Sequence, residues 1–190
     1  MIRGLVPLIS YIGKYGMTSN WALPTLITQY AEPGAENHHV PWLEVDGFSG
    51  LKNKDGRSIK TSRDLIHIAK EPRHDLTEKT YFLKITGFIF TSLPETLAGI
   101  EVRLTMQRYG RISDETIQLC LNDTLVGDNQ TTFNLDPIKL YGNETSIWNT
   151  QLTIANIQDP SFGVILRFRS HPSWPHKNGA LIDAVEIRVH

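Results

Sequence analysis

Apolar and polar residues alternate along much of the second half of the chain. Between Ile100 and Gln107 every second residue is apolar, and the residues between them are polar. This period of two predicts a β-strand with one face on a core and the other face in water. The same alternation, or an apolar run of strand length, recurs at residues 81–88, 117–122, 124–126, 164–169 and 184–189.

Turn-forming residues separate these predicted strands. Gly110 follows the first of them, and Asn122-Asp123 predicts a tight hairpin because both residues tolerate a positive φ angle. Long polar connections are expected at residues 128–146 and 170–178. Short strands joined by turns and polar loops predict an all-β fold, a β-sandwich or jelly roll, over residues 41–190.

Helix is expected in very little of the chain. Thr153 and the four residues after it predict one short helical turn, with Thr153 as its N-cap. Residues 61–64 are expected to lead into a further strand at residues 65–68 rather than into a helix.

Residues 1–40 show neither helical nor strand periodicity. Closely spaced prolines and glycines, among them Pro7, Gly13 and Gly16, exclude long helices. The segment is nevertheless rich in apolar and aromatic residues, which disordered linkers normally lack. We therefore expect an extended, irregular N-terminal arm. It would bury its side chains on its own domain or, preferentially, along a neighbouring subunit.

The charge balance and the cysteine content exclude several classes of protein. The 190 residues include 19 basic and 20 acidic side chains, a net charge of −1, whereas nucleic-acid binding needs a basic face. No apolar run approaches the ~18–20 residues that cross a bilayer. Cys120 is the only cysteine, so it can form no internal disulfide, and we expect a small, buried strand residue. The sequence thus predicts no nucleic-acid partner and no membrane partner.

His171 and His176 are the most suggestive pair for a metal site, because they lie five residues apart on a Pro-rich loop. A metal site needs further ligands on converging elements, and no nearby residues have that spacing, so a stiff polar loop is the preferred interpretation. The sequence pattern also indicates no calcium loop, carboxylate pair, phosphate loop or nucleophile motif. We therefore predict no catalytic residue, no metal and no cofactor, and a protein that is not an enzyme.

Several aromatic residues and arginines are candidates for contact with a ligand or partner. Trp21, Tyr109 and Trp174 could stack on sugars if exposed, but an interface anchor or a core plug is the preferred interpretation. The arginines expected on a polar outer face that meets another subunit are Arg103, Arg108, Arg167 and Arg169.

A series of short motifs, in order along the chain, carries a resemblance to a known family. They are Trp42, Lys54-Asp55-Gly56-Arg57-Ser58, Leu83 to Phe90 with Leu93-Pro94, Ala98 to Val102, Leu125 to Asn129, Tyr141-Gly142 with Trp148, Thr153 to Ile157, Ser161-Phe162-Gly163-Val164, and Ile182 to Val189. From about Trp42 to His190 the chain resembles a β-sandwich (jelly-roll-like) domain family of tailed-bacteriophage structural proteins. Leu152 departs from the pattern, which would place an aromatic residue there, and residues 1–40 lie outside the resemblance.

The motif residues are expected to determine the fold rather than to carry chemistry. Trp148 is expected to plug one end of the sandwich. Gly163 is expected to give the ring of Phe162 room where the chain bends, and Asp183 to accept hydrogen bonds from a neighbouring loop.

The resemblance implies a structural component of a tailed-phage virion, such as a capsid-decoration, neck or tail-associated protein. Its partners would be other virion proteins and copies of itself, in particles assembled in the bacterial cytoplasm. Deletion of residues 1–37 is then expected to leave a folded sandwich that no longer joins the particle. The alternative is a receptor-binding module on the particle surface with a host glycan as ligand. A hydrolase on a sandwich fold is a third and weaker hypothesis, since it needs two converging carboxylates.

Overall fold

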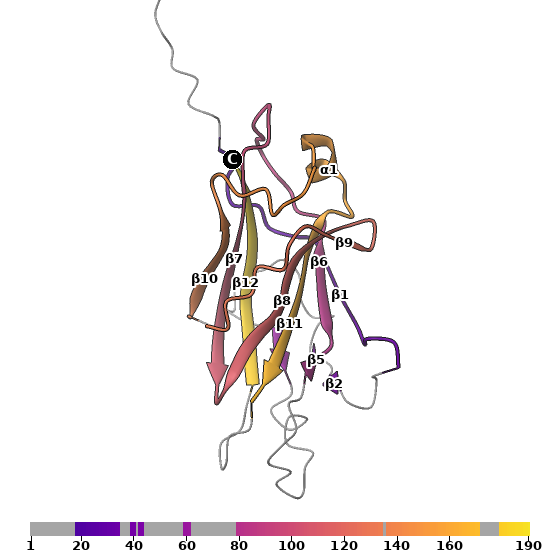
Figure 1. Cartoon of the computed structure of the whole chain (residues 1–190), viewed down its shortest axis with the longest axis vertical. Helices are drawn as coiled ribbons and strands as arrows, with labels where there is room; N and C mark the ends of the chain where they lie inside the picture. Colours follow the sequence, from indigo (N-terminus) through magenta and orange to yellow (C-terminus); the bar gives the residue numbers. More distant parts are fainter. Residues whose placement is uncertain are drawn as a thin grey trace, which may run out of the picture.

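Two β-sheets pack face to face in the described part of the chain (Figure 1). This computed structural model describes residues 18–34, 39–40, 42–43, 59–61, 79–134, 136–171 and 179–190. The paired strands run antiparallel, apart from β2 and β5, which are parallel. The predicted all-β fold with sandwiched sheets is confirmed.

The two sheets differ in their strand order. Sheet I contains, in spatial order, β10 (Ile138–Asn143), β7 (Ile100–Tyr109), β12 (Gly179–Val189), β4 (Ile59–Thr61) and β3 (Trp42–Leu43). Sheet II is built around β11 (Gly163–Ser170), with β8 (Ile112–Leu121) on one side and β6 (Phe82–Thr86) and β5 (Lys79–Thr80) on the other. It is completed by β1 (Leu26–Tyr30) beside β6, β2 (His39–Val40) beside β5 and β9 (Thr124–Val126) beside β8. Among the described residues the one helix is α1 (Ile154–Gln158).

The alternating strands direct their apolar side chains into one core between the sheets. Leu104 of β7 lies opposite Val185 of β12, and both are fully buried. Burial of a side chain of this size stabilises the fold by about 1.5–3 kcal/mol. The ring of Phe168 from sheet II meets the ring of Trp42 from sheet I edge-on, with 5.7 Å between centroids. Trp148 is buried as expected, and its indole N–H donates to a carbonyl of β7 at 2.8 Å.

The predicted turns are confirmed. Asn122 and Asp123 have φ angles of 49° and 63°, as the primed hairpin turns require, and they join β8 to β9. Gly110, with φ of 67°, lies in the turn that carries the chain from β7 in sheet I to β8 in sheet II. Thr153 is the N-cap of α1, and its side chain forms a reciprocal capping box with Asn156.

The structure bears on the roles expected for Gly163 and Asp183. A Cβ on Gly163 would lie 1.9 Å from the carbonyl oxygen of Ile85, so Gly163 is needed where β11 closely approaches β6. The hydrogen bonds expected for Asp183 stay a prediction, because the loop before β12, residues 172–178, lies outside the described ranges. Asp183 is the extra residue of a β-bulge between Ile182 and Ala184 in β12, which leaves it outside the ladder.

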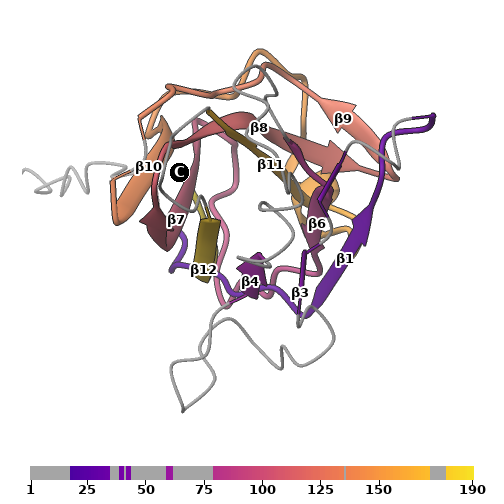
Figure 2. The same cartoon turned by 90° about the horizontal axis from the view of Figure 1, so that it is seen from below.

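Residues 18–30 cross from sheet I to sheet II, and Figure 2 shows the two curled sheets in a ring that this segment helps to close. Ala22 exchanges two backbone hydrogen bonds with Ile187 of β12. Leu23 accepts a hydrogen bond from the N–H of Ile89 at 3.1 Å, and β1 then pairs with β6 along its whole length. We call residues 18–30 the strap.

The strap revises the picture of the N-terminal arm. Residues 18–34 were expected in an irregular arm that favours a neighbouring subunit, but they contain β1 and pack on their own domain. Ala22 is fully buried there. An arm in residues 1–17 stays a prediction, because these residues lie outside the described ranges, as does the strand expected at 65–68.

Candidate functional site

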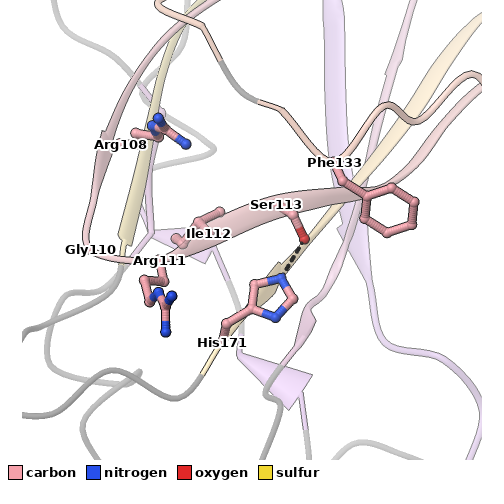
Figure 3. Close-up of a pocket in the computed structure, with 7 residues that line it drawn as sticks. All are labelled: Arg108, Gly110, Arg111, Ile112, Ser113, Phe133 and His171. Carbon is pink, nitrogen blue, oxygen red and sulfur yellow. Dashed lines mark hydrogen bonds between the residues drawn. The ribbon is translucent and has the colours of Figure 1, made fainter.

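A pocket lies where the turn between β7 and β8 meets the end of β11 (Figure 3). Its lining combines two guanidinium groups, an aromatic ring and a Ser–His pair: Arg108, Gly110, Arg111, Ile112, Ser113, Phe133 and His171. The hydroxyl of Ser113 and Nε2 of His171 form a hydrogen bond of 2.7 Å. In Figure 3 the rings of Phe133 and His171 flank Ser113.

The backbone of sheet II positions the Ser–His pair. Ser113 of β8 lies opposite Arg169 of β11 in the ladder. His171 follows directly after β11, and its N–H donates to the carbonyl of Arg111 at 2.8 Å. The pair therefore forms between two adjacent strands, and its geometry depends on their register.

Asp114 holds the aromatic wall of the pocket in place. Its fully buried carboxylate accepts hydrogen bonds from the N–H groups of Thr132 (3.0 Å) and Phe133 (2.7 Å) and from the hydroxyl of Tyr141 (3.1 Å). Burial, and then the charge of Asp114, raise the pKa of Tyr141, so its hydroxyl keeps the proton that it donates. Phe133 has a φ of 59°, which bulky residues rarely adopt, and 69% of its surface is exposed.

A serine bonded to a histidine has the spacing of a nucleophile and its general base. Ser113 is only 3% exposed, however, and the neighbouring Asp114 is already occupied by three donors away from the imidazole. The arrangement suits binding better than acyl transfer. A pocket lined by an exposed ring and by guanidinium groups presents an apolar face and positive charge to a polar ligand.

A second surface lies on the outer face of sheet I and centres on Trp21 of the strap. The guanidinium carbons of Arg103 and Arg188 lie 4.1 Å and 4.6 Å from its ring centroid. Arg103 pairs with Glu186 at 2.7 Å, and Arg188 pairs with Glu101 at 2.6 Å, each across neighbouring strands. We call Trp21, Glu101, Arg103, Glu186 and Arg188 the Trp21 patch.

Hydrogen bonds fix the charge state of this patch. Burial by itself would raise the pKa of Glu101, but hydrogen bonds from Arg188 and His190 outweigh it and hold that pKa below its ordinary value. Glu101 is therefore ionised near neutral pH, and it anchors both arginine and histidine against β7.

A third surface, on the outer face of sheet II, surrounds the buried Arg167. Its guanidinium donates to Glu32 and to Nε2 of His39, both at 2.8 Å, and lies 4.4 Å from the ring centroid of Phe82. Because Nε2 of His39 accepts this bond, the proton of the neutral ring sits on Nδ1. Burial first, and then the charge of Arg167, lower the pKa of His39. We call Glu32, His39, Phe82 and Arg167 the Arg167 cluster.

Three of the four arginines predicted for a polar outer face are engaged within the chain. Arg167 pairs with Glu32, and Arg169 pairs with Glu115 at 3.0 Å. Arg103 belongs to the Trp21 patch, whereas Arg108 is exposed and lines the pocket.

The other candidates from the sequence have mixed outcomes. Trp21 is half-buried between two arginines rather than free to stack on a sugar. The side chain of Tyr109 lies outside the described residues, as do Trp174 and His176, so the proposed metal loop stays untested. Cys120 is fully buried as expected, and burial raises the pKa of its thiol to about 12.

Metal ligands and membrane spans were also sought in the described ranges. No three His, Cys, Asp or Glu side chains of these ranges lie close enough together to hold a metal ion. No helix in the same ranges is long and apolar enough to span a bilayer.

Sequence reasoning missed Ser113 and Phe133. An aromatic residue among the polar residues 128–134 was a signal that could have marked Phe133. Ser113 carried no such signal, because its contact with His171 depends on the register of β8 against β11, which shifts at a bulge beside Arg167.

Comparisons with models of known protein families, with curated proteins and with solved structures found no match for this chain. The fold and its surfaces define its class: an all-β sandwich of two curled sheets, closed by a strap and carrying ordered polar clusters on both outer faces. Because one fold serves many functions, its function has to be argued from those surfaces.

Proposed function

We propose that the protein is a structural component of a tailed-bacteriophage particle, as a capsid-decoration, neck or tail-associated subunit that acts through protein–protein contacts. The Trp21 patch carries the proposal. Tryptophan and arginine are the residues most enriched at the centres of protein interfaces. Here the ring lies between Arg103 and Arg188, and each guanidinium is already oriented by a carboxylate.

Preorganisation makes this patch suitable for a permanent contact. A partner that covers Trp21 does not have to order the flanking side chains, so less conformational entropy is lost on binding. The near-zero net charge of the chain also suits assembly of many copies side by side. The motifs between Trp42 and His190 that resemble phage structural proteins supply the assignment to a particle.

Particles assembled in cells that supply a Trp21→Ala variant test the proposal. Loss of a central tryptophan costs about 2 kcal/mol or more of binding, which is a roughly 30-fold weaker affinity. The variant is expected to be depleted from purified particles when measured by quantitative mass spectrometry. Tyr30→Ala, which removes a partly exposed ring on the outer face of sheet II, is the matched control. Normal incorporation of Trp21→Ala would contradict the interface role, and absence of the wild-type chain from particles would contradict the assignment itself.

The pocket favours a second candidate, a glycan-binding module on the particle surface. Phe133 exposes its ring in the pocket that Arg108 and the Ser113–His171 pair also line, and sugars bind by stacking on rings with polar groups at the edge. Phe133→Ala should then abolish binding to host polysaccharide, whereas Leu125→Ala, at an exposed position of β9, should not. No binding by the wild-type chain at millimolar sugar would remove this candidate.

A further inference from the structure

One edge of β10 has no strand partner among the described residues. Within the described residues β10 pairs only with β7, and in Figure 1 it is the outermost strand of sheet I. The carbonyl of Pro137 accepts a hydrogen bond from Met106 of β7 at 2.9 Å. Because alternate residues of an antiparallel strand face the partner, Ile138 and Leu140 direct their N–H and C=O groups away from β7. These groups make no hydrogen bond to any described residue.

Both residues also expose apolar side chains. Ile138 is 62% exposed and Leu140 is 48% exposed, both on the outer face of sheet I. An edge that combines unpaired backbone groups with exposed aliphatic side chains is a template for one more strand.

We propose that β10 accepts residues 8–12 of a neighbouring copy as an added antiparallel strand. This rests on the proposed function, since it names the surface on which the arm of an assembled subunit docks. The sequence Leu-Ile-Ser-Tyr-Ile at these positions lies between Pro7 and Gly13 and consists largely of residues that favour strands. Pro7, which cannot donate to a ladder, falls outside the paired stretch.

The register follows from the free groups of β10. Ile12, Ser10 and Leu8 would face Ile138, Leu140 and Gly142 in turn. The pairs at Ile138 and Leu140 each exchange two backbone hydrogen bonds, about four in all. Gly142, with a φ of 76°, lies at the irregular end of β10 and is not counted. Small residues then oppose large ones, with Ser10 across from Leu140 and Gly142 across from Leu8.

The length of the tether requires a neighbour rather than the same chain. The described chain begins at Thr18, whose hydroxyl lies 3.3 Å from His190 beside the end of β12. All ladders of sheet I are antiparallel, so Ile12 would lie at the Ile138 end of β10. From there to Thr18 is roughly 27 Å, from six residues of strand rise and four strand spacings, because residues 18–22 lie on the edge of β12 away from β7. The six residues from Ile12 to Thr18 extend over at most about 22 Å.

Charge favours the arm, rather than the β10 strand of a second copy, as the occupant of this edge. Residues 1–17 contain Arg3 and Lys14 and no acidic side chain. Exposed Asp136 and Glu144 lie just beyond the two ends of β10. Antiparallel pairing of two β10 strands about Leu140 would set Asp136 against Glu144 of the other copy, which is unfavourable, whereas the basic arm complements both.

An engineered disulfide tests the contact in the full-length chain. In the proposed register the Cα atoms of Ser10 and Leu140 lie about 5.5 Å apart, within the range for a disulfide. Ser10→Cys combined with Leu140→Cys should give covalent dimers and higher oligomers on oxidation. Ser10→Cys with Leu125→Cys is the control, because Leu125 has a similar exposed fraction, 42%, on β9. The native Cys120 is buried and should not compete.

Each result decides the question. Oligomers from the Leu140 pair and not from the Leu125 pair support the proposal. A disulfide within one chain would show that the arm folds back, and equal yields from both pairs, or none from either, would show that β10 is not the acceptor. Particle incorporation of the Trp21→Ala variant is a separate measurement, so the contact with β10 can fail while the proposed function stands.

Discussion

At the scale of single residues, Nδ1 of His39 and Nε of Arg167 are buried without a hydrogen-bond partner in the described ranges, whereas the other buried polar side chains there have partners. Asp114 is the clearest case, because one buried carboxylate satisfies two backbone N–H groups of the 128–137 loop and the hydroxyl of Tyr141. A buried charge is tolerated only when such donors replace its lost hydration. The loop before β10 and the display of Phe133 therefore depend on this side chain.

Replacement of Asp114 by Asn tests that dependence. The amide keeps one acceptor oxygen but turns a donor toward groups that themselves donate, so the free energy of unfolding should fall by about 3 kcal/mol. Urea denaturation of the variant measures the loss. Asp128→Asn, at an exposed carboxylate in the same loop, should change it by less than about 0.5 kcal/mol. Equal effects of the two substitutions would contradict the buried role of Asp114.

His39 should make stability depend on pH. Its pKa in the folded protein lies below the ordinary value of 6.5, so the unfolded chain takes up the proton first as the pH falls. The stabilising contribution of neutral His39 is thus complete above about pH 6.5 and is lost as the pH falls below it. The charged groups that act on the ring are Arg167, Glu32, Lys79 and Glu115.

His39→Gln isolates this effect, because Gln keeps an acceptor for Arg167 and does not titrate. Between pH 7 and 5 the variant should lose less stability than the wild-type chain in urea titrations. The hydrogen bond from Arg167 lowers the pKa of Glu32. Protonation of Glu32 should therefore reduce the stability of the protein only at a lower pH than protonation of His39. If the stability of both proteins fell in parallel between pH 7 and 5, the loss could not be assigned to His39.

At the scale of elements, alternation in the sequence predicted β7, β8, β11 and β12 and the faces that they bury. The turn at Asn122-Asp123 and the cap at Thr153 followed from local preferences that the tertiary structure does not override. The strand β1 could not be predicted, because nothing in Leu26–Tyr30 reveals the partner β6. The pocket could not be predicted from the sequence either, because a turn, a loop and a strand end form it, and only the register of sheet II brings these together.

Gly163 tests the contact between two elements. Its Cα faces the carbonyl of Ile85 so closely that an added methyl group would overlap it, and backbone cannot move aside as a flexible side chain can. Gly163→Ala should therefore cost about 3 kcal/mol in thermal or urea unfolding. At Gly34 a methyl group meets open space, so Gly34→Ala should cost only about 1 kcal/mol for its φ of 79°. A cost for Gly163→Ala as small as that for Gly34→Ala would contradict the close approach of β11 to β6.

At the scale of the whole molecule, the strap covers a strand edge in each of the two sheets. It hydrogen-bonds to β12 through Ala22 and then supplies β1 as the neighbour of β6. Without it, both strands would present unpaired backbone groups, and core residues beneath the strap would meet water. The boundary between an arm that can be removed and the domain should therefore fall near residue 18, earlier than the sequence pattern indicates.

Two truncations locate that boundary. Deletion of residues 1–17 should leave the melting temperature within a few degrees of the full chain, because the strap keeps its hydrogen bonds to β12 and β6. Deletion of residues 1–30 removes β1 and the Ala22 contacts, and should lower the melting temperature by about 10 °C or more or leave the chain insoluble. Hydrogen exchange should then rise along the exposed edges of β12 and β6 and stay slow in β7. If the longer truncation melted like the shorter one, the strap would be only an attachment, and the earlier boundary near residue 40 would be restored.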